Sequence, residues 1–167
     1  MKKLLSGIVI AFVLLQGCTK KNDTCSYTDS TLTAPKIEVD SLQAYLTKNS
    51  ISATQNPAGF FYTITPAATG KAIVNLCSTL TVKYKGKFVN GSVFDSTATS
   101  TTAAFQLGQV IVGWQKGLPL IKSNEKITLY IPPTLGYGFT DVRDAGGHVV
   151  IPANSILIFD IELVDVN

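Results

Sequence analysis

The sequence has few of the residues that carry out most enzymatic chemistry. Its 167 residues include one His, three Cys and one Trp, and charged side chains make up only 15% of the chain. It contains no HExxH, no CxxC and no phosphate-binding glycine motif, and no GxSxG nucleophile elbow. His148 lies in a Gly-rich stretch, which favours a solvated loop residue over a metal ligand or a base. Metal, redox and covalent catalysis are therefore poorly supported, and we expect neither a metal nor a cofactor.

The chain also lacks an excess of charge of one sign. It has 14 Lys and Arg against 11 Asp and Glu. Removal of residues 1–17 would leave 12 basic and 11 acidic side chains, and no basic stripe is interleaved with aromatic residues. Nucleic-acid binding needs such a basic surface, so we expect no nucleic-acid partner.

The N-terminus has the features of a targeting segment. A pair of lysines precedes an apolar run over residues 4–15, which is too short to span a bilayer comfortably. This arrangement predicts a signal peptide over residues 1–17. Its ending, LQGC, resembles the bacterial lipobox, in which the cysteine (here Cys18) is acylated, although Gln16 departs from the small or β-branched residue usual there. We expect export and lipid anchoring to a bacterial cell membrane, at its periplasmic or outer-membrane face. The alternative is an ordinary signal peptide or an uncleaved anchor with an incidental cysteine.

The other two cysteines, Cys25 and Cys77, allow two interpretations. Export permits a disulfide between them, and such a bridge would close a loop of about fifty residues, a constraint worth roughly 2–4 kcal/mol. Alternatively both thiols are unpaired, one of them buried and the other in a mobile tail. A thiol count on the unreduced protein distinguishes the two.

The segment before the main domain divides into two parts. Residues 18–35 are rich in Thr, Ser, Asp, Asn and Lys and have few large apolar side chains, which is typical of a flexible tether. Apolar residues at helical spacing then predict a short amphipathic helix over residues 36–49, with Asp40 as its N-cap. We expect residues 36–59 to form a helical extension that docks on the domain.

Residues 60–167 have the pattern of an α+β domain with about five antiparallel strands. Alternating apolar and polar side chains over residues 78–88 predict a half-buried strand. Residues 112–121 predict a short helix that Pro119 distorts. Further strands are predicted over residues 60–65, 94–96, 105–107, 125–131 and 155–166.

Two connections in this domain have distinct sequence features. Asn90-Gly91 predicts a hairpin turn of type I′, which needs positive φ at both central positions. Residues 132–150 predict a long Gly-rich loop.

Aromatic residues gather near glycines and turns in this domain, although each one alone is better explained as core. Together with their flanking motifs they resemble the FKBP-type peptidyl-prolyl cis-trans isomerases over roughly residues 60–167. Seven motifs agree in order and spacing: VKYKG (82–86), NGxxFDS (90–96), FxLG (105–108), VIxGW (110–114), LGYG (135–138), IP (151–152) and LIFDIEL (157–163). The N-terminal helix and the direct LGQVI connection are more similar to the secreted bacterial members, the macrophage infectivity potentiator group, than to small cytosolic ones.

The resemblance implies a curved antiparallel sheet wrapped around the short helix, with a pocket between them. It assigns Trp114 to the pocket floor, and Asp95 and the Tyr137 hydroxyl to its polar, catalytic groups. The Ile151 backbone N–H is the implied donor to a bound carbonyl. The implied substrate-binding side chains around the floor are Tyr84, Phe94, Phe105, Val110, Ile111, Val150, Ile151 and Phe159.

Three departures from the family pattern bear on this pocket. Ala103 stands where small cytosolic members have an aromatic residue, which should open one wall and weaken binding of their macrolide ligands. Asn124 replaces the usual Gly, a mild change because Asn tolerates positive φ. The loop over residues 139–149 is longer than in the smallest members, which leaves the placement of Val150 open.

The implied activity fits a chain that is poor in nucleophiles and bases. Rotation about an X–Pro bond faces a barrier of ~18–20 kcal/mol from amide resonance, although the cis and trans forms are close in energy. The planar amide is more charge-separated than the twisted one, so an apolar pocket disfavours the ground state relative to the transition state.

We therefore expect a monomeric isomerase that acts on X–Pro bonds of exported proteins. The alternative is a non-catalytic module that holds proline-containing or unfolded chains in the same pocket. A purely structural lipoprotein would leave the aromatic residues unexplained.

Overall fold

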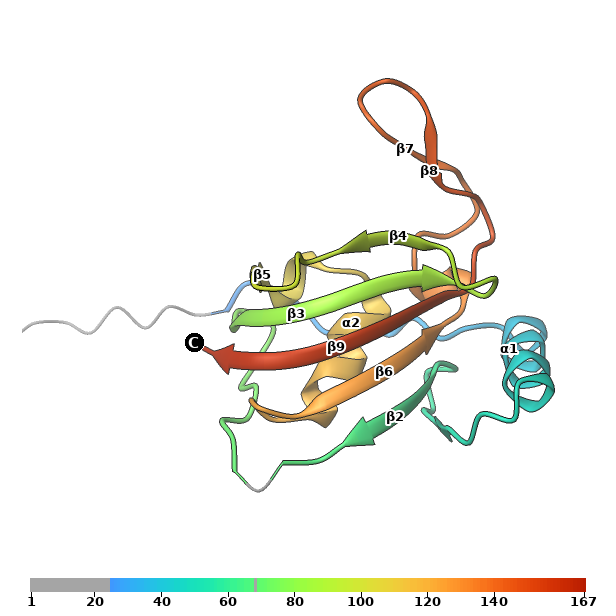
Figure 1. Cartoon of the computed structure of the whole chain (residues 1–167). Coiled ribbons are helices and arrows are strands. Elements are labelled where there is room, and N and C mark those ends of the chain that lie inside the picture. Colours follow the sequence, from blue (N-terminus) through green and yellow to red (C-terminus); the bar gives the residue numbers. More distant parts are fainter. Residues whose placement is uncertain (1–24, 68) are drawn as a thin grey trace, which may run out of the picture.

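Segments with alternating apolar residues pair into an antiparallel sheet in the described part of the chain, residues 25–67 and 69–167 of a computed structural model (Figure 1). Its strands are β1 (Thr54–Gln55), β2 (Phe61–Thr65), β3 (Thr79–Phe88), β4 (Val93–Ser96), β5 (Ala103–Gln106), β6 (Lys126–Ile131) and β9 (Leu157–Val166). The order is β1-β2-β6-β9-β3-β4, and β5 also pairs with β3. The predicted α+β class is confirmed, with seven strands in the described sheet where about five were expected. The predicted signal peptide and Cys18 lie outside the described residues.

The central helix α2 (Val112–Gly117) packs on the inner face of this sheet. Two glycines make the close approach possible. A Cβ built on Gly113 would lie 2.6 Å from the side chain of Ile131, and one on Gly117 would lie 2.6 Å from that of Leu129. Both of these β6 side chains are fully buried. Gly113, within VIxGW, and Gly117, one turn later, therefore allow Trp114 to pack against the sheet.

The helix predicted over residues 112–121 is shorter in the structure. The α-helix ends at Gly117, and a 3₁₀ turn over Leu118–Leu120 follows it. Pro119, within that turn, lacks the N–H that an α-helix would need there. The predicted distortion by this proline is confirmed.

Helix α1 (Lys36–Lys48) packs against a second part of the sheet, beside the ends of β6 and β9 (Figure 1). Its buried residues join side chains of β2, β6 and β9 in a cluster separate from the main core: Leu42, Leu46, Phe61, Tyr130 and Ile158. The predicted docking of this helix is therefore confirmed. The predicted N-cap is wrong, because the helix begins earlier, after Pro35. Asp40 lies inside the helix and pairs with Lys36 at 2.6 Å.

The turn between β3 and β4 contains Asn90-Gly91 as predicted, but it is not type I′. Of the two, only Gly91 has positive φ, at 85°. The Phe88 carbonyl accepts a hydrogen bond from the Gly91 N–H, and the Phe88 N–H donates to the Ser92 carbonyl, each at 2.9 Å. This pattern is a three-residue loop with glycine in the last position. The Asn90 side chain accepts a hydrogen bond from the Ser92 N–H at 2.9 Å, which fits its frequent use in turns.

Residues 132–150 are not the irregular loop that their glycine content predicts. They include most of a hairpin of β7 (Val142–Arg143) and β8 (Val149–Ile151), which projects from the sheet (Figure 1). Asp144 closes the tip, because its Oδ1 accepts hydrogen bonds from two backbone N–H groups of the turn, at 2.8 and 2.9 Å. The chain after β6 therefore has defined structure.

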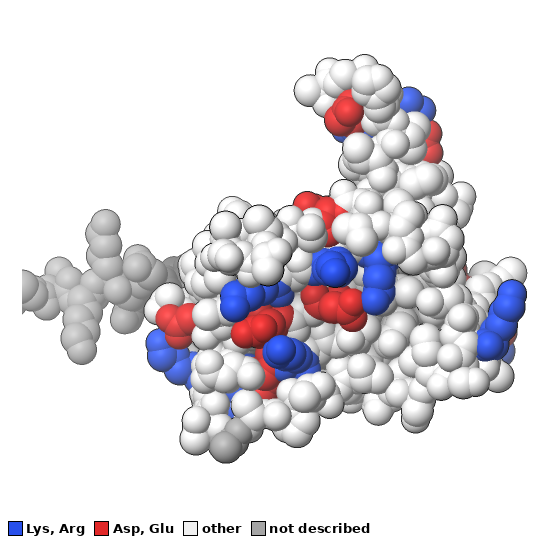
Figure 2. Space-filling view, viewed as in Figure 1, with Lys and Arg blue, Asp and Glu red and all other residues white. Residues whose placement is uncertain are grey.

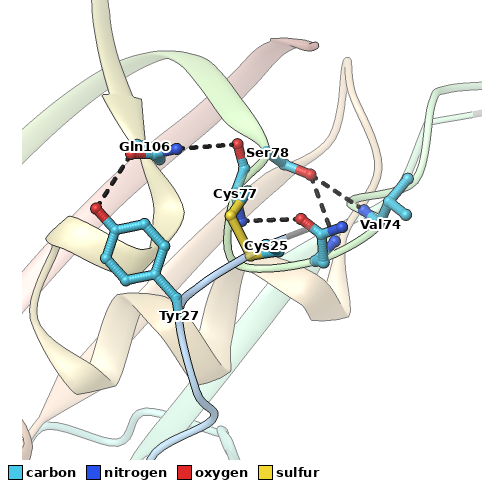
Figure 3. Close-up of a disulfide and its surroundings, with 7 residues drawn as sticks. Cys25, Tyr27, Val74, Cys77, Ser78 and Gln106 are labelled. Carbon is cyan, nitrogen blue, oxygen red and sulfur yellow. Dashed lines mark hydrogen bonds between the residues drawn. A yellow bond between two sulfur atoms is a disulfide. The ribbon is translucent and has the colours of Figure 1, made fainter. Parts of the chain in front are cut away.

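The N-terminal arm, residues 25–35, begins with a disulfide between Cys25 and Cys77 (Figure 3). The Cα atoms of the two cysteines are 5.5 Å apart, and 52 positions separate them in the sequence. Of the two interpretations that the sequence allows, the structure has the bridge. From there the arm passes behind α2 toward α1 in the view of Figure 1.

Further contacts hold the arm along its length. The Tyr27 hydroxyl donates a hydrogen bond to Gln106 Oε1 at 3.2 Å (Figure 3), and the Tyr27 ring occupies the space where any side chain on Gly108 would lie. The Ala34 N–H donates to the Ala58 carbonyl at 2.8 Å. The flexible tether predicted over residues 18–35 is therefore a docked segment in its described part.

The outer face of the sheet carries charges of both signs over β3, β9 and β6 (Figure 2). Glu162 lies between Lys83 and Lys126, at 3.8 and 3.5 Å, and Asp160 pairs with Lys87 at 2.7 Å. Neighbouring charges thus neutralise one another, and this face carries no patch of one sign. Among the described residues, no helix is long and apolar enough to cross a membrane.

Candidate functional site

Six of the seven sequence motifs contribute residues to a cavity of about 250 Å³ beside α2. Side chains from β3, β4, β5, β9, α2 and the chain after β6 contribute to it. The lining residues are Tyr84, Asp95, Phe105, Gln109, Val110, Ile111, Trp114, Tyr137 and Phe159. Residues far apart in the sequence therefore converge on one hollow.

Trp114 forms the floor of this cavity and is almost completely buried. Its ring meets those of Tyr84, Phe105 and Phe159 nearly at right angles, with centroids 5.5, 5.8 and 5.2 Å away. Edge-to-face contacts of this kind favour a fixed arrangement of rings. Within the described residues the indole N–H is a buried donor without a hydrogen-bond partner, a cost that the packing of the rings has to offset.

Phe94 belongs to this aromatic group but does not line the cavity. Its ring packs edge-on against Phe159, with centroids 5.5 Å apart, and against Phe88 at 4.9 Å. Gly86 provides the space, because a Cβ there would lie 2.6 Å from the Phe94 ring and 2.9 Å from the Phe159 ring. Phe94 therefore supports a wall from behind.

The polar side of the cavity begins with a hydrogen bond between two lining residues. The Tyr84 hydroxyl donates to Asp95 Oδ2 at 2.6 Å. Burial, followed by this bond to the carboxylate, raises the pKa of Tyr84 well above its ordinary value. The hydroxyl therefore stays protonated and holds one oxygen of Asp95, which leaves the other oxygen available to a ligand.

Tyr137 places a second hydroxyl at the cavity, from a side chain that is 43% exposed. Burial of the hydroxyl raises its pKa, and the negative charge of Asp95 raises it further. The group is therefore a neutral hydrogen-bond donor at neutral pH. Gly138, which follows, has a φ of 78°, a left-handed conformation that glycine adopts without strain.

Two residues that the resemblance assigned to the walls lie elsewhere. Val150 is 41% exposed on β8, in the projecting hairpin, while Ile151 is buried in the main core. Neither lines the cavity. The cause is the hairpin of β7 and β8, which carries the chain away from the cavity before it returns.

Gln109 also lines the cavity, although the motifs of the sequence did not indicate it. It directly precedes Val110 and Ile111, which were assigned, so its position in the chain was a usable indication. Ala103, at the start of β5, pairs with Val82 on β3 and is not among the lining residues. Asn124 has a φ of 72°, so the expected positive φ at this position is confirmed.

The described residues contain no group of three or more His, Cys, Asp or Glu side chains placed to hold a metal ion. His148 lies at the hairpin tip with an 83% exposed side chain, 3.2 Å from Asp144. The prediction that it is a solvated loop residue is confirmed.

A second hollow, of about 370 Å³, lies on the outer face of the sheet. It is lined by the paired lysines and acids of that face together with threonines of the 97–99 loop. Ion pairs exposed to water contribute little binding energy. The aromatic cavity is therefore the better candidate site, since apolar walls with a few convergent polar groups are typical of ligand pockets.

A curved antiparallel sheet around a short helix, with an aromatic cavity between them that has few acids or bases, defines an α+β class of protein suited to hold an apolar ligand. The chain belongs to the FKBP-type peptidyl-prolyl cis-trans isomerase family, whose family model matches residues 70–164. All lining residues of the cavity fall within that match, whereas α1 and the arm precede it.

Individual relatives agree with this membership. The chain is 43% identical over 114 residues to the FKBP-type isomerase FkpA of Buchnera aphidicola subsp. Schizaphis graminum. The aligned region covers 68% of this chain and 43% of the relative. A probable FKBP-type isomerase of Haemophilus influenzae is 42% identical over 134 residues, covering 79% and 52%. The crystal structure of Escherichia coli FkpA superposes with a TM-score of 0.65 at 35% identity, covering 79% of this chain and 60% of that one. The chain thus spans about half the length of these curated relatives.

Proposed function

We propose that this chain is an active peptidyl-prolyl isomerase (a rotamase) that twists X–Pro bonds without forming a covalent intermediate. One observation carries the proposal. Three aromatic rings, each from a different strand, meet around Trp114 on α2 and leave a cavity large enough for a proline ring and its neighbouring amides. A planar amide loses the solvation of its separated charges in such a cavity, so the twisted form is favoured relative to it.

In this mechanism Trp114 is the floor beneath the proline ring, and Tyr84, Phe105 and Phe159 are the walls. Val110 and Ile111 complete the apolar lining. Phe94 acts from behind, by fixing the ring of Phe159.

Asp95 and Tyr137 are the polar groups of the proposed mechanism. The Tyr137 hydroxyl donates to the rotated carbonyl or to the proline nitrogen. The free oxygen of Asp95, which can only accept, takes a hydrogen bond from a backbone N–H of the substrate, and the Ile151 backbone N–H donates to a second carbonyl of the substrate. Val150 contacts the substrate at the rim, from the projecting hairpin.

The proposed location is outside the bacterial cytoplasm, where the isomerase assists the folding of exported proteins. The disulfide supports this setting, because such bonds persist in oxidising compartments. Residues 1–17 are the proposed signal peptide, and acylation of Cys18 anchors the protein to the membrane, in the periplasm or at the outer membrane. The protein acts as a monomer with no cofactor.

The proposed domain division follows the packing. Residues 60–167 form the isomerase domain and residues 36–59 a helical extension of it. Residues 25–35 are not part of a flexible tether, because the disulfide fixes the arm at Cys25.

A peptide assay tests the activity. The purified chain, with its disulfide intact, accelerates isomerisation of an X–Pro peptide, and Asp95→Ala and Tyr137→Phe each reduce turnover while the circular dichroism spectrum is unchanged. Absence of acceleration by the folded wild-type chain overturns the proposal. Equal rates for the wild type and both variants would instead refute only the roles of these two residues.

A second function, holding of unfolded chains, is favoured by exposed apolar side chains in the segment that follows Tyr137. Phe139 is 63% exposed and Val149 is 43% exposed. Suppression of aggregation that survives Asp95→Ala and Tyr137→Phe would support holding as a separate activity. Loss of suppression in both variants would assign it to the same cavity.

A further inference from the structure

We infer that Glu38, on α1 and outside the family match, positions Tyr137 for the proposed isomerase reaction. The inference rests on the proposed function, because it concerns the same cavity. Its observation is a pair of hydrogen bonds across 96 positions of the sequence. Glu38 Oε2 accepts from the Thr134 N–H at 3.0 Å, and Glu38 Oε1 accepts from the Thr134 hydroxyl at 2.7 Å.

The Thr134 N–H needs a partner from elsewhere in the molecule. Thr134 is the second residue of a 3₁₀ turn, Pro133–Leu135, and the first N–H groups of such a turn have no partner within it. The preceding Pro133 has no N–H, and the residue before the turn makes no side-chain cap. Glu38 therefore supplies the cap from another helix.

The start of α1 leaves Glu38 free for this contact. A Glu in the first turn of a helix often bonds back to the N–H of the N-cap residue. Here the N-cap is Pro35, which has no N–H. The carboxylate reaches across to Thr134 instead, and both residues are half-buried there.

The capped turn leads directly to Tyr137. The Gly136 and Gly138 N–H groups, on either side of Tyr137, both donate to the Pro133 carbonyl at 2.9 Å, and the side chain of Leu135 is fully buried. Tyr137 is thus at the exposed end of a tight segment whose first turn is fixed by Glu38. Release of that turn would let the Tyr137 hydroxyl move relative to Asp95, and a shift of about 1 Å at a reacting group can lower a rate by roughly a hundredfold.

The kinetic test uses the full chain and an X–Pro peptide. Glu38→Ala lowers kcat/KM on the order of tenfold, mainly through kcat, because Tyr137 acts in the transition state more than in binding. Glu38→Gln recovers most of the loss, since its amide oxygen still accepts a hydrogen bond. Asp40→Asn, on the same helix and paired only with Lys36, leaves the rate unchanged.

A double-mutant cycle separates positioning from a general structural effect. In the Tyr137→Phe background Glu38→Ala has less than about a twofold effect, because the hydroxyl it would displace is gone. Independent, multiplying effects of the two substitutions overturn the inference. Thr134→Val, which removes one of the two bonds from the other side, gives an intermediate loss and serves if Glu38→Ala does not fold.

A readout without turnover keeps the inference separate from the proposed function. In Glu38→Ala, but not in Asp40→Asn, the Thr134 amide proton exchanges faster and the NMR resonances of the Tyr137 ring shift. Unchanged exchange and unchanged Tyr137 resonances overturn the inference even if the wild type shows no isomerase activity. Changed resonances in a chain without activity would refute only the proposed function.

Discussion

The aromatic cavity and the N-terminal extension, residues 25–59, are held by different kinds of interaction. The cavity depends on rings that pack edge to face around Trp114, so its energy is spread over many contacts of similar size. The extension depends on separate attachments: one disulfide, the cluster around Leu42 and Leu46, and single hydrogen bonds such as Glu38 to Thr134. Changes of side-chain volume should therefore damage the cavity, whereas loss of one specific atom should damage the extension.

The family match divides the molecule at nearly the same place. Residues 70–164 match the family and contain the whole cavity. The extension lies outside the match, yet it contacts the domain at its start, where Cys25 bonds to Cys77, and again where Glu38 bonds to Thr134. The residues that line the cavity and the residues of the extension that support it therefore come from separate parts of the sequence.

The largest effect is expected from Trp114→Ala. Removal of a buried indole from a packed core lowers the free energy of unfolding by roughly 3–5 kcal/mol, and the loss of the floor lowers kcat/KM by on the order of a hundredfold. Denaturant unfolding and the peptide assay measure the two effects. Trp114→Phe, which keeps a ring there, should lose less of both. If it loses as much as the Ala variant, ring volume does not govern the cavity.

The next largest effect is expected from removal of the disulfide by the Cys25→Ser, Cys77→Ser double substitution. The unfolded chain gains the freedom of a loop of 52 positions, so stability falls by roughly 2–4 kcal/mol. At temperatures well below unfolding, kcat/KM should be unchanged, because no lining residue lies in the arm. Wild type treated with a reductant is the matched control. A fall in activity comparable to that of Trp114→Ala would break the distinction between the two regions.

Most of the sheet could be predicted from the sequence because alternation of apolar residues has one physical cause, the two faces of a strand. The long strands β3 and β9 were found in this way. The aromatic floor was predictable only through the resemblance of VIxGW to the family motif. The structure adds that two glycines bring α2 against β6.

The remainder could not be predicted because it depends on distant partners. Glycine content over residues 132–150 indicates a loop, but the hairpin there is closed by Asp144 accepting from the backbone. The polar arm is docked because of Cys77 and Gly108, which lie in other segments. The same hairpin is the reason why Val150 lies on β8 and not among the lining residues.

A change of one atom inside the cavity separates the effect of polar contacts from the effect of ring packing. Tyr84→Phe removes the hydroxyl that holds Asp95 at 2.6 Å and leaves the ring volume almost unchanged. We expect kcat/KM to fall about tenfold, because Asp95 loses its fixed orientation, while stability changes by only about 1 kcal/mol. The peptide assay and denaturant unfolding measure both quantities. A loss of stability as large as that of Trp114→Ala would show that polar contacts hold the cavity together, contrary to the distinction between the regions.

The smallest effect is expected from pH. The folded pKa values of Tyr84 and Tyr137 lie above the ordinary value of 10.0, chiefly because of burial and further because of Asp95. Above about pH 10 the unfolded chain releases these protons while the folded chain keeps them, so their contribution to stability is complete below that pH and is lost as the pH rises. Both hydroxyls remain donors across the neutral range, and kcat/KM should be flat from about pH 6 to about pH 9.

A pH–rate profile with circular dichroism at each pH checks this prediction, and Tyr137→Phe is its control. If activity of the folded wild type falls with an apparent pKa below about 9, and Tyr137→Phe abolishes that step, the hydroxyl ionises too easily to be a buried neutral donor. The cavity would then stabilise a charged form of Tyr137 that is inactive. Its apolar walls would then contribute less to activity than their packing implies. The cavity would depend on single polar groups, as the extension does.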